Sequence, residues 1–245
     1  HKLHGHSFDL TGKISANPYV QAKWSYDMPD IPTVNASASF RWTDMSMLNF
    51  GTNNLSLSYF NARQEVYLSN IKWRFLDIRG GLRNDIFDIR NIKASNVIDE
   101  YDKTSLTNDF MSLFADGRTD TFDDGYFPTK GVNAGLSYAW TFAGIPEMIN
   151  NFHTLQADAK LVVPGGDGFT FIPSFYCRFL MGKEIPLAYF NAIGGSLPGR
   201  FVDQQVPFIG LTNLVAMKNI MTMFRTDFRF EVARNHYVTG TINYV

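Results

Sequence analysis

Two short segments come close to the pattern of a hydrolase nucleophile, a serine held between glycines on a sharp turn from strand to helix. They read Gly135-Leu-Ser-Tyr-Ala139 and Gly194-Gly-Ser-Leu-Pro198, and both lack the closing glycine. Ser137 also falls within a regular alternation of apolar and polar residues, which indicates the interior of a strand. We therefore predict no catalytic residue within this sequence, while an enzymatic domain upstream of His1 stays an open question.

Residues that could hold a metal ion or a cofactor are scarce and poorly spaced. His4 and His6 could chelate a metal at the start of the chain, but their alternation equally places them on one face of a strand. The aspartate-rich segment 116–125 lacks the closing glutamate of an EF-hand, which favours a solvated turn over a calcium loop. Cys177 is the single cysteine, so an internal disulfide is excluded. We expect neither a metal nor a cofactor.

Charged residues are balanced overall, and their clearest order lies near the end of the chain. Lys and Arg number 22 against 23 Asp and Glu, so the sequence has no basic field for nucleic acid. Between Met221 and Val232, arginines and acids alternate with apolar residues and fall on one face of a strand; they are Arg225, Asp227, Arg229 and Glu231. Such a face fits the wet interior of a barrel, although a soluble sheet would turn the same face to solvent.

Alternation with a period of two recurs along the whole chain and predicts its elements. The clearest segments are 34–42, 132–142 and 155–161, each with an apolar and a polar face. Less regular segments predict further strands at 8–16, 19–26, 55–61, 66–75, 78–89, 110–116, 169–180, 221–232 and 237–245. The chain is therefore predicted to be all-β, with about 12 strands.

Several features favour an antiparallel transmembrane β-barrel over a soluble sandwich. Many predicted strands reach the roughly 9 to 11 residues that cross a bilayer at a tilt. Aromatic residues make up 15% of the chain, and Tyr19, Trp42, Trp140 and Phe142 near strand ends are expected to form interfacial girdles. Connections alternate between tight turns at 164–168 and 233–236 and long loops at 91–109 and 182–219, which is typical of outer-membrane barrels.

A motif at the start of the clearest strand resembles a known family. The aspartate-rich segment continues as Tyr126-Phe-Pro-Thr-Lys-Gly131, in which Pro128 fixes φ and Gly131 frees the backbone. This motif, with Phe127, resembles the bacterial surface antigen barrels, the superfamily of outer-membrane insertases and two-partner secretion pores. The resemblance implies a place in the bacterial outer membrane, with membrane lipid as a partner.

The longest loop carries a second resemblance. Ile193-Gly-Gly-Ser-Leu-Pro-Gly-Arg-Phe201 precedes Val202-Asp-Gln-Gln-Val-Pro-Phe208. In the superfamily a loop folds back into the barrel and places an arginine against acidic wall residues, which implies that Arg200 and Phe201 form a structural lock with Asp227 or Glu231. The order here is Gly-Arg-Phe rather than Arg-Gly-Phe. This version looks most like barrels attached behind patatin-like phospholipase domains.

The superfamily's layout also bears on the extent of the chain. It places such a loop between the eleventh and twelfth of about 16 strands, whereas ten predicted strands precede the loop here and two follow it. We therefore expect residues 1–245 to form a single outer-membrane β-barrel domain that is incomplete at both ends.

The sequence is compatible with three functions. The first is an outer-membrane barrel that anchors, secretes or inserts a polypeptide, with a polypeptide passenger or a fused upstream patatin-like domain as its partner. The second is a passive diffusion porin, which needs an open lumen. The third is a soluble β-sandwich binding module. The sequence does not fix the passenger or the oligomeric state.

Overall fold

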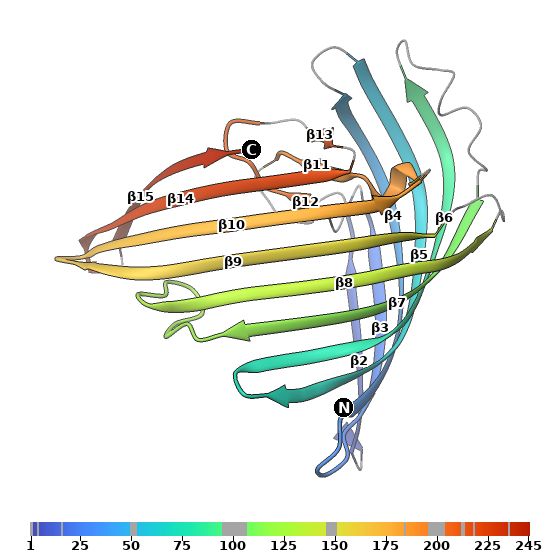
Figure 1. The fold of residues 1–245 in the computed structure, drawn as a ribbon, viewed down its shortest axis with the longest axis horizontal. Helices are drawn as coiled ribbons and strands as arrows, with labels where there is room; N and C mark the ends of the chain where they lie inside the picture. The colour runs from blue at the N-terminus through green and yellow to red at the C-terminus, as the bar shows by residue number, and fades with distance from the viewer. Residues whose placement is uncertain are drawn as a thin grey trace.

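A long antiparallel sheet dominates the computed structural model of the chain (Figure 1). Twelve strands follow one another along the path of the sheet in chain order. The residues that the structure describes are 2–3, 5–15, 17–49, 53–94, 107–145, 151–183, 185–195, 204–211, 214–217, 219–234 and 236–245.

The strands on this path are β1 (Lys2–Leu3), β2 (His6–Lys13), β3 (Tyr19–Tyr26), β4 (Thr33–Asn49), β5 (Asn53–Trp73), β6 (Leu76–Ala94), β7 (Thr107–Asp120), β8 (Gly131–Ile145), β9 (Phe152–Gly166), β10 (Phe169–Gly182), β14 (Ile220–Ala233) and β15 (His236–Tyr244). The connection between β10 and β14 holds the 3-10 helix η1 (Leu187–Tyr189) and the short strands β11 (Asn191–Ile193), β12 (Gln205–Val206) and β13 (Leu214–Met217). The predicted all-β antiparallel arrangement is confirmed.

The clearest difference from the prediction is β5, and the short strands β11, β12 and β13 lie within the predicted loop 182–219. Residues 55–61 and 66–75 were expected to form two strands, but both belong to β5, which is 21 residues long. The pairing of β5 with β6 shifts between Ser58 and Tyr59 and again between Leu68 and Ile71. Such irregularities interrupt the alternation of faces, so a continuous strand looks broken in the sequence.

The two rims of the sheet differ in their connections. Residues 27–32, 74–75, 121–130 and 167–168 make short connections at one edge of the strands, which we call the short-turn rim. β2, β4, β6, β8 and β10 end at the opposite edge, which we call the long-loop rim. Asp167 (φ 46°) and Gly168 (φ 76°) adopt the positive φ that a two-residue hairpin turn requires.

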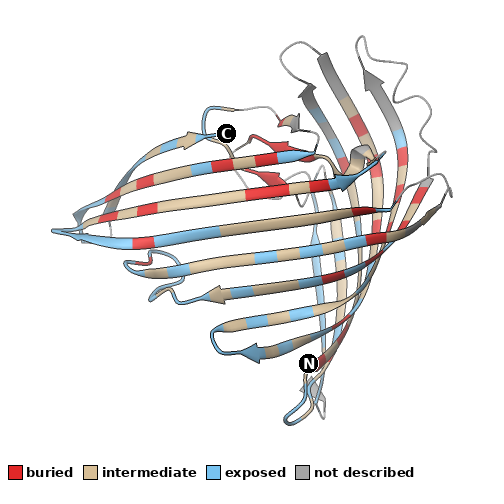
Figure 2. Cartoon of the chain, in the orientation of Figure 1, coloured by how far each residue is buried: buried red, intermediate tan, exposed pale blue. Residues whose placement is uncertain are grey.

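The sheet is strongly curved, and its two faces differ in polarity. On β8, Leu136 lies on the outer face and is 56% exposed, whereas its neighbour Ser137 lines a cavity on the concave side. Figure 2 shows that buried positions gather on the strands around β11, β12 and β13, which lie on that concave side. In the part of the chain that the structure describes, no helix is long and apolar enough to cross a membrane.

Aromatic side chains cluster near both rims. On the outer face close to the long-loop rim, Trp140 packs against Phe142 with ring centroids 5.3 Å apart. Close to the short-turn rim, Trp24 and Tyr26 stack at 6.4 Å. Tyr19, which was expected in a girdle, lies on the concave side instead. It pairs with Arg41 across β3 and β4, and both residues line a cavity on that side. The Arg41 guanidinium lies 5.0 Å from the centroid of the Tyr19 ring.

Because the two faces differ in polarity, a lysine substitution should have different effects on stability at two neighbouring positions. Leu136→Lys places a charge on the outer face and should lower the free energy of unfolding by about 2–4 kcal/mol. Ser137→Lys is its matched control, because residue 137 lies opposite Asp116 on the wet face. Urea unfolding in lipid vesicles, followed by heat-modifiable migration on a gel, measures both. Equal destabilisation by the two substitutions would contradict the assignment of the faces.

Candidate functional site

The connection between β10 and β14 folds onto the concave side of the sheet. We call its described residues 185–195, 204–211 and 214–217 the inner segment. Its strand β11 pairs in parallel with β12 and antiparallel with β13. β13 in turn pairs with β4 through Leu214 and Met47, on a stretch of β4 that extends beyond its pairing with β3. At the other side, Asn243 of β15 donates a hydrogen bond to the carbonyl of Ile209 at 3.3 Å, so the inner segment reaches from β4 to β15.

Tyr189 anchors the inner segment in an aromatic cluster of the wall. Its ring centroid lies 5.6 Å from that of Phe87, 5.3 Å from Phe110 and 4.9 Å from Phe152, all in edge-on arrangements. Phe110 and Phe152 are completely buried. The Tyr189 hydroxyl donates a hydrogen bond to Oδ2 of Asp85 at 3.2 Å. The apolar ring of Tyr189 is therefore packed among other rings, while its hydroxyl has a hydrogen-bond partner.

Arg178 on β10 holds the backbone of the same segment. Its Nη1 donates to the carbonyl of Tyr189 and to Oδ1 of Asn191, both at 2.8 Å, and the side chain is 6% exposed. Gln204 donates from Nε2 to the carbonyl of Ala188 at 2.8 Å. These contacts satisfy backbone groups that would otherwise be buried without partners.

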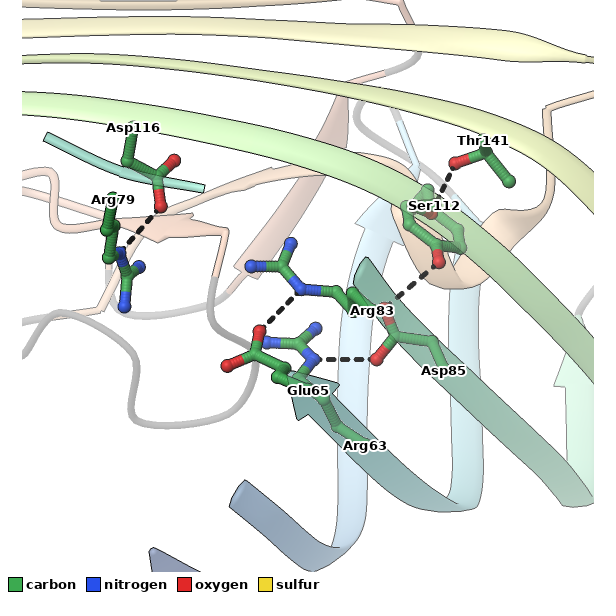
Figure 3. Close-up of polar contacts among 9 residues, drawn as sticks. Arg63, Glu65, Arg79, Arg83, Asp85, Ser112, Asp116 and Thr141 are labelled. Carbon is green, nitrogen blue, oxygen red and sulfur yellow. Dashed lines mark hydrogen bonds and ion pairs between the residues drawn. The ribbon is translucent and has the colours of Figure 1, made fainter. Parts of the chain in front are cut away.

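The wall beside Tyr189 carries a ladder of ion pairs between strands (Figure 3). The three pairs, which join opposed residues of β5, β6 and β7, are Arg63 Nε with Asp85 Oδ1 at 2.6 Å, Arg83 Nε with Glu65 Oε1 at 2.6 Å and Arg79 Nε with Asp116 Oδ2 at 2.8 Å. Because side chains at alternate positions share a face, the pairs all project into the concave side. A cavity of about 280 Å³ lies between this ladder and the inner segment.

The predicted lock is described only in part. Arg200 and Phe201 lie outside the described residues, so their pairing stays a prediction. Asp227 is buried on the expected face, where Oδ1 accepts hydrogen bonds from Arg225 Nε at 2.9 Å and from Thr241 Oγ1 at 2.6 Å. Glu231 is exposed near the short-turn rim.

The Phe-Pro-Thr-Lys-Gly motif makes contacts far from its own strands. Pro128 is buried, and its carbonyl accepts a hydrogen bond from Arg229 on β14. The ring of Phe127 stacks on Tyr237 of β15 at 4.8 Å. Gly131 has φ +120°, and a Cβ there would collide with the carbonyl of Thr121, so only glycine fits. The turn 121–130 thus contacts the side of the sheet formed by β14 and β15.

The aspartates of this turn bind its own backbone. Thr129 donates its hydroxyl to Asp123, which lowers the pKa of that carboxyl from 3.8 to about 2. The backbone N–H groups of Phe127 and Tyr126, each 2.7 Å from Oδ1 of Asp124, hold the pKa of Asp124 below its usual value. Among the described residues, no group of three or more histidine, cysteine or acidic side chains is arranged to hold a metal ion.

Comparison with known proteins identifies the family. The family model of the OMP85 superfamily matches residues 29–245. The chain belongs to the OMP85 superfamily. The predicted resemblance and the location in the bacterial outer membrane are confirmed with it.

A solved structure agrees with this assignment. The OMP85 chain is similar to the crystal structure of BamA from Haemophilus ducreyi lacking POTRA domains 1–3, with a TM-score of 0.75 and 14% sequence identity. The similarity covers 98% of this chain and 51% of that one, so this chain spans about half the length of the structure that it matches. The predicted barrel fold is confirmed. A search of curated proteins finds no match.

Several site residues of this OMP85 barrel were missed in the sequence. Asp85 and Arg83 belong to an alternation of charges in β6 like the one noted at 221–232, so period-two counting could have found them. Arg178 stands alone in an apolar run, which marks a buried cation that needs partners. Tyr189 has no local signal, because its role depends on contact with strands about 100 residues earlier in the chain.

Two substitutions at Tyr189 separate the hydroxyl from the ring in the OMP85 barrel. Tyr189→Phe loses one hydrogen bond and should cost about 1 kcal/mol of unfolding free energy. Tyr189→Ala also empties the aromatic cluster and should cost about 3–5 kcal/mol. Tyr126→Ala is the control, because Tyr126 is 90% exposed, and its effect should stay within about 0.5 kcal/mol. Urea unfolding in detergent measures all three, and a Tyr189→Ala variant as stable as this control would contradict the anchor.

Order in the turn 121–130 should depend on pH. The pKa of Asp123 falls from 3.8 to about 2 on folding, so its stabilising effect is complete above the unfolded value and disappears as pH falls through the folded value. We expect protection of the Thr129 and Lys130 amides from hydrogen exchange, corrected for intrinsic rates, to fall between pH 4 and pH 2. Asp123→Asn should remove this dependence and Asp167→Asn should preserve it. An Asp123→Asn protein that keeps the wild-type profile would refute the role of Asp123.

Proposed function

We propose that this chain is the membrane-embedded barrel of a protein that inserts or secretes polypeptides, surrounded by outer-membrane lipid. The observation that supports the proposal is the inner segment, which extends across the concave side from β4 to β15. A packed aromatic cluster and the buried Arg178 hold this segment against the wall. Such a barrel has a closed resting state that a passing polypeptide must open.

A passive diffusion porin is the competing function. It uses the same strands but requires a permanently open lumen. The contacts of Tyr189 and Arg178 disfavour it, because removing the segment would expose the buried Phe110 and Phe152 to water. The soluble sandwich is excluded by membership of the OMP85 superfamily.

Further parts of the proposal come from the sequence alone. We propose that Arg200 and Phe201 complete the hold on the inner segment, with Asp227 or Glu231 as the acidic partner. We also propose that residues 1–245 act as one barrel domain, and that the partner is a polypeptide passenger or a fused upstream patatin-like domain. The Gly-Arg-Phe order and the Gln-Gln-Val-Pro-Phe sequence support the patatin-type branch.

Conductance and proteolysis test the function and the lock separately. We expect the full-length protein in planar bilayers to give small or flickering currents, because the inner segment lies across the concave side from β4 to β15. Arg200→Ala should increase the current and expose the segment to protease, since a charge-assisted contact of about 1.5–3 kcal/mol is lost. Ser137→Ala is a control that leaves both unchanged. Large steady currents in the wild type would favour the porin, whereas an Arg200→Ala protein identical to wild type would refute the lock alone.

A further inference from the structure

The described lining of the cavity beneath the inner segment carries more guanidinium groups than carboxylates. Its lining includes five arginines and two aspartates; they are Arg41, Arg63, Arg79, Arg83, Arg178, Asp85 and Asp116. A smaller cavity of about 150 Å³ shares four of these arginines and adds Glu65. Among the described residues, the two spaces together are lined by five guanidinium groups and three carboxylates, and Arg41 and Arg63 have further partners. The surplus is local, because the chain as a whole has a formal charge of -1.

The ion pairs of the ladder use only part of the arginine donors. A guanidinium group carries five N–H donors. In the described part of the chain, Arg83 makes its hydrogen bond through Nε to Glu65, and Arg79 does so through Nε to Asp116. Figure 3 shows the Nη ends of Arg79 and Arg83 without contacts to the other residues drawn. Both side chains line the cavity, so these ends can bind a ligand there.

Arg178 supplies a second, independent observation. It is 6% exposed, and its two acceptors within the described residues, the Tyr189 carbonyl and the Asn191 side-chain amide, are both neutral. A buried cation with neutral partners keeps an uncompensated charge in a region of low dielectric constant. Because Arg178 also lines the cavity, an anion placed there would offset this charge.

We propose that this cavity is an oxyanion-binding site that takes a carboxylate or phosphate group. Planar guanidinium groups match both anions through paired N–H donors. Arg79 and Arg83 lie on the wall and Arg178 lies beside the inner segment, so a bound oxyanion would connect the two. The space lies on the concave side of the sheet and is lined mainly by polar side chains. The proposal does not depend on whether the barrel secretes or inserts polypeptides.

Titration of the full-length protein in detergent with inorganic phosphate tests the site. We expect saturable binding by calorimetry at constant ionic strength. Arg83→Gln should weaken binding about tenfold, because a charge-assisted contact is lost. Arg118→Gln is the matched control, since Arg118 pairs with Asp158 on the same face but does not line this cavity. Its phosphate affinity should equal that of the wild type.

A folding check on each variant and a competition experiment with acetate complete the test. Heat-modifiable migration confirms folding of each variant, and Arg79→Gln replaces Arg83→Gln if the latter does not fold. Competition by acetate assigns the site to carboxylates in general, whereas resistance to acetate assigns it to phosphate. Absence of saturable phosphate binding, or equal weakening by Arg83→Gln and Arg118→Gln, would overturn the proposal.

Discussion

Every strand of this sheet has to present an apolar face to lipid and a polar face to the interior, and the rest of the structure depends on that constraint. Side chains alternate along a strand, so a membrane-facing leucine such as Leu136 forces its neighbour Ser137 inward. The ion pairs of the ladder occupy inner positions, where register sets their residues opposite one another. The ladder of Arg63 with Asp85 and Glu65 with Arg83 follows directly from this register.

A polar interior then determines how a segment can be held inside it. The wall offers both a cluster of buried aromatic rings and polar groups, so the inner segment combines both kinds of contact. Tyr189 places its ring among phenylalanines and its hydroxyl on Asp85, an acid that already pairs with Arg63. Arg178 binds the Tyr189 carbonyl and the side-chain amide oxygen of Asn191 rather than an acid. The inner segment is therefore attached to the same polar network that pairs the strands, and loss of one contact strains its neighbours.

Period-two patterns were enough to predict the fold class, the charged face of β14 and most strands, because burial on one face leaves a local signature. They failed where the signature is interrupted or absent. The shifted pairing of β5 made one strand look like two, and Tyr19 was assigned to a girdle because an aromatic residue at a strand end does not reveal its face. Apart from the family resemblance, no pattern in the sequence indicated the contacts that hold the inner segment. Tyr189 contacts Asp85, Phe87 and Phe110, which are far from it in the chain.

Different structural elements lie at the two ends of the interior. Near the long-loop rim the inner segment lies across the concave side from β4 to β15, whereas at the short-turn rim the turn 121–130 reaches β14 and β15 through Pro128 and Phe127. Arg229, which binds Pro128, shares its face of β14 with Asp227 and with Met223, and Met223 packs in the cluster around the inner segment. β14 therefore contacts elements at both ends of the interior, the turn 121–130 through Arg229 and the inner segment through Met223.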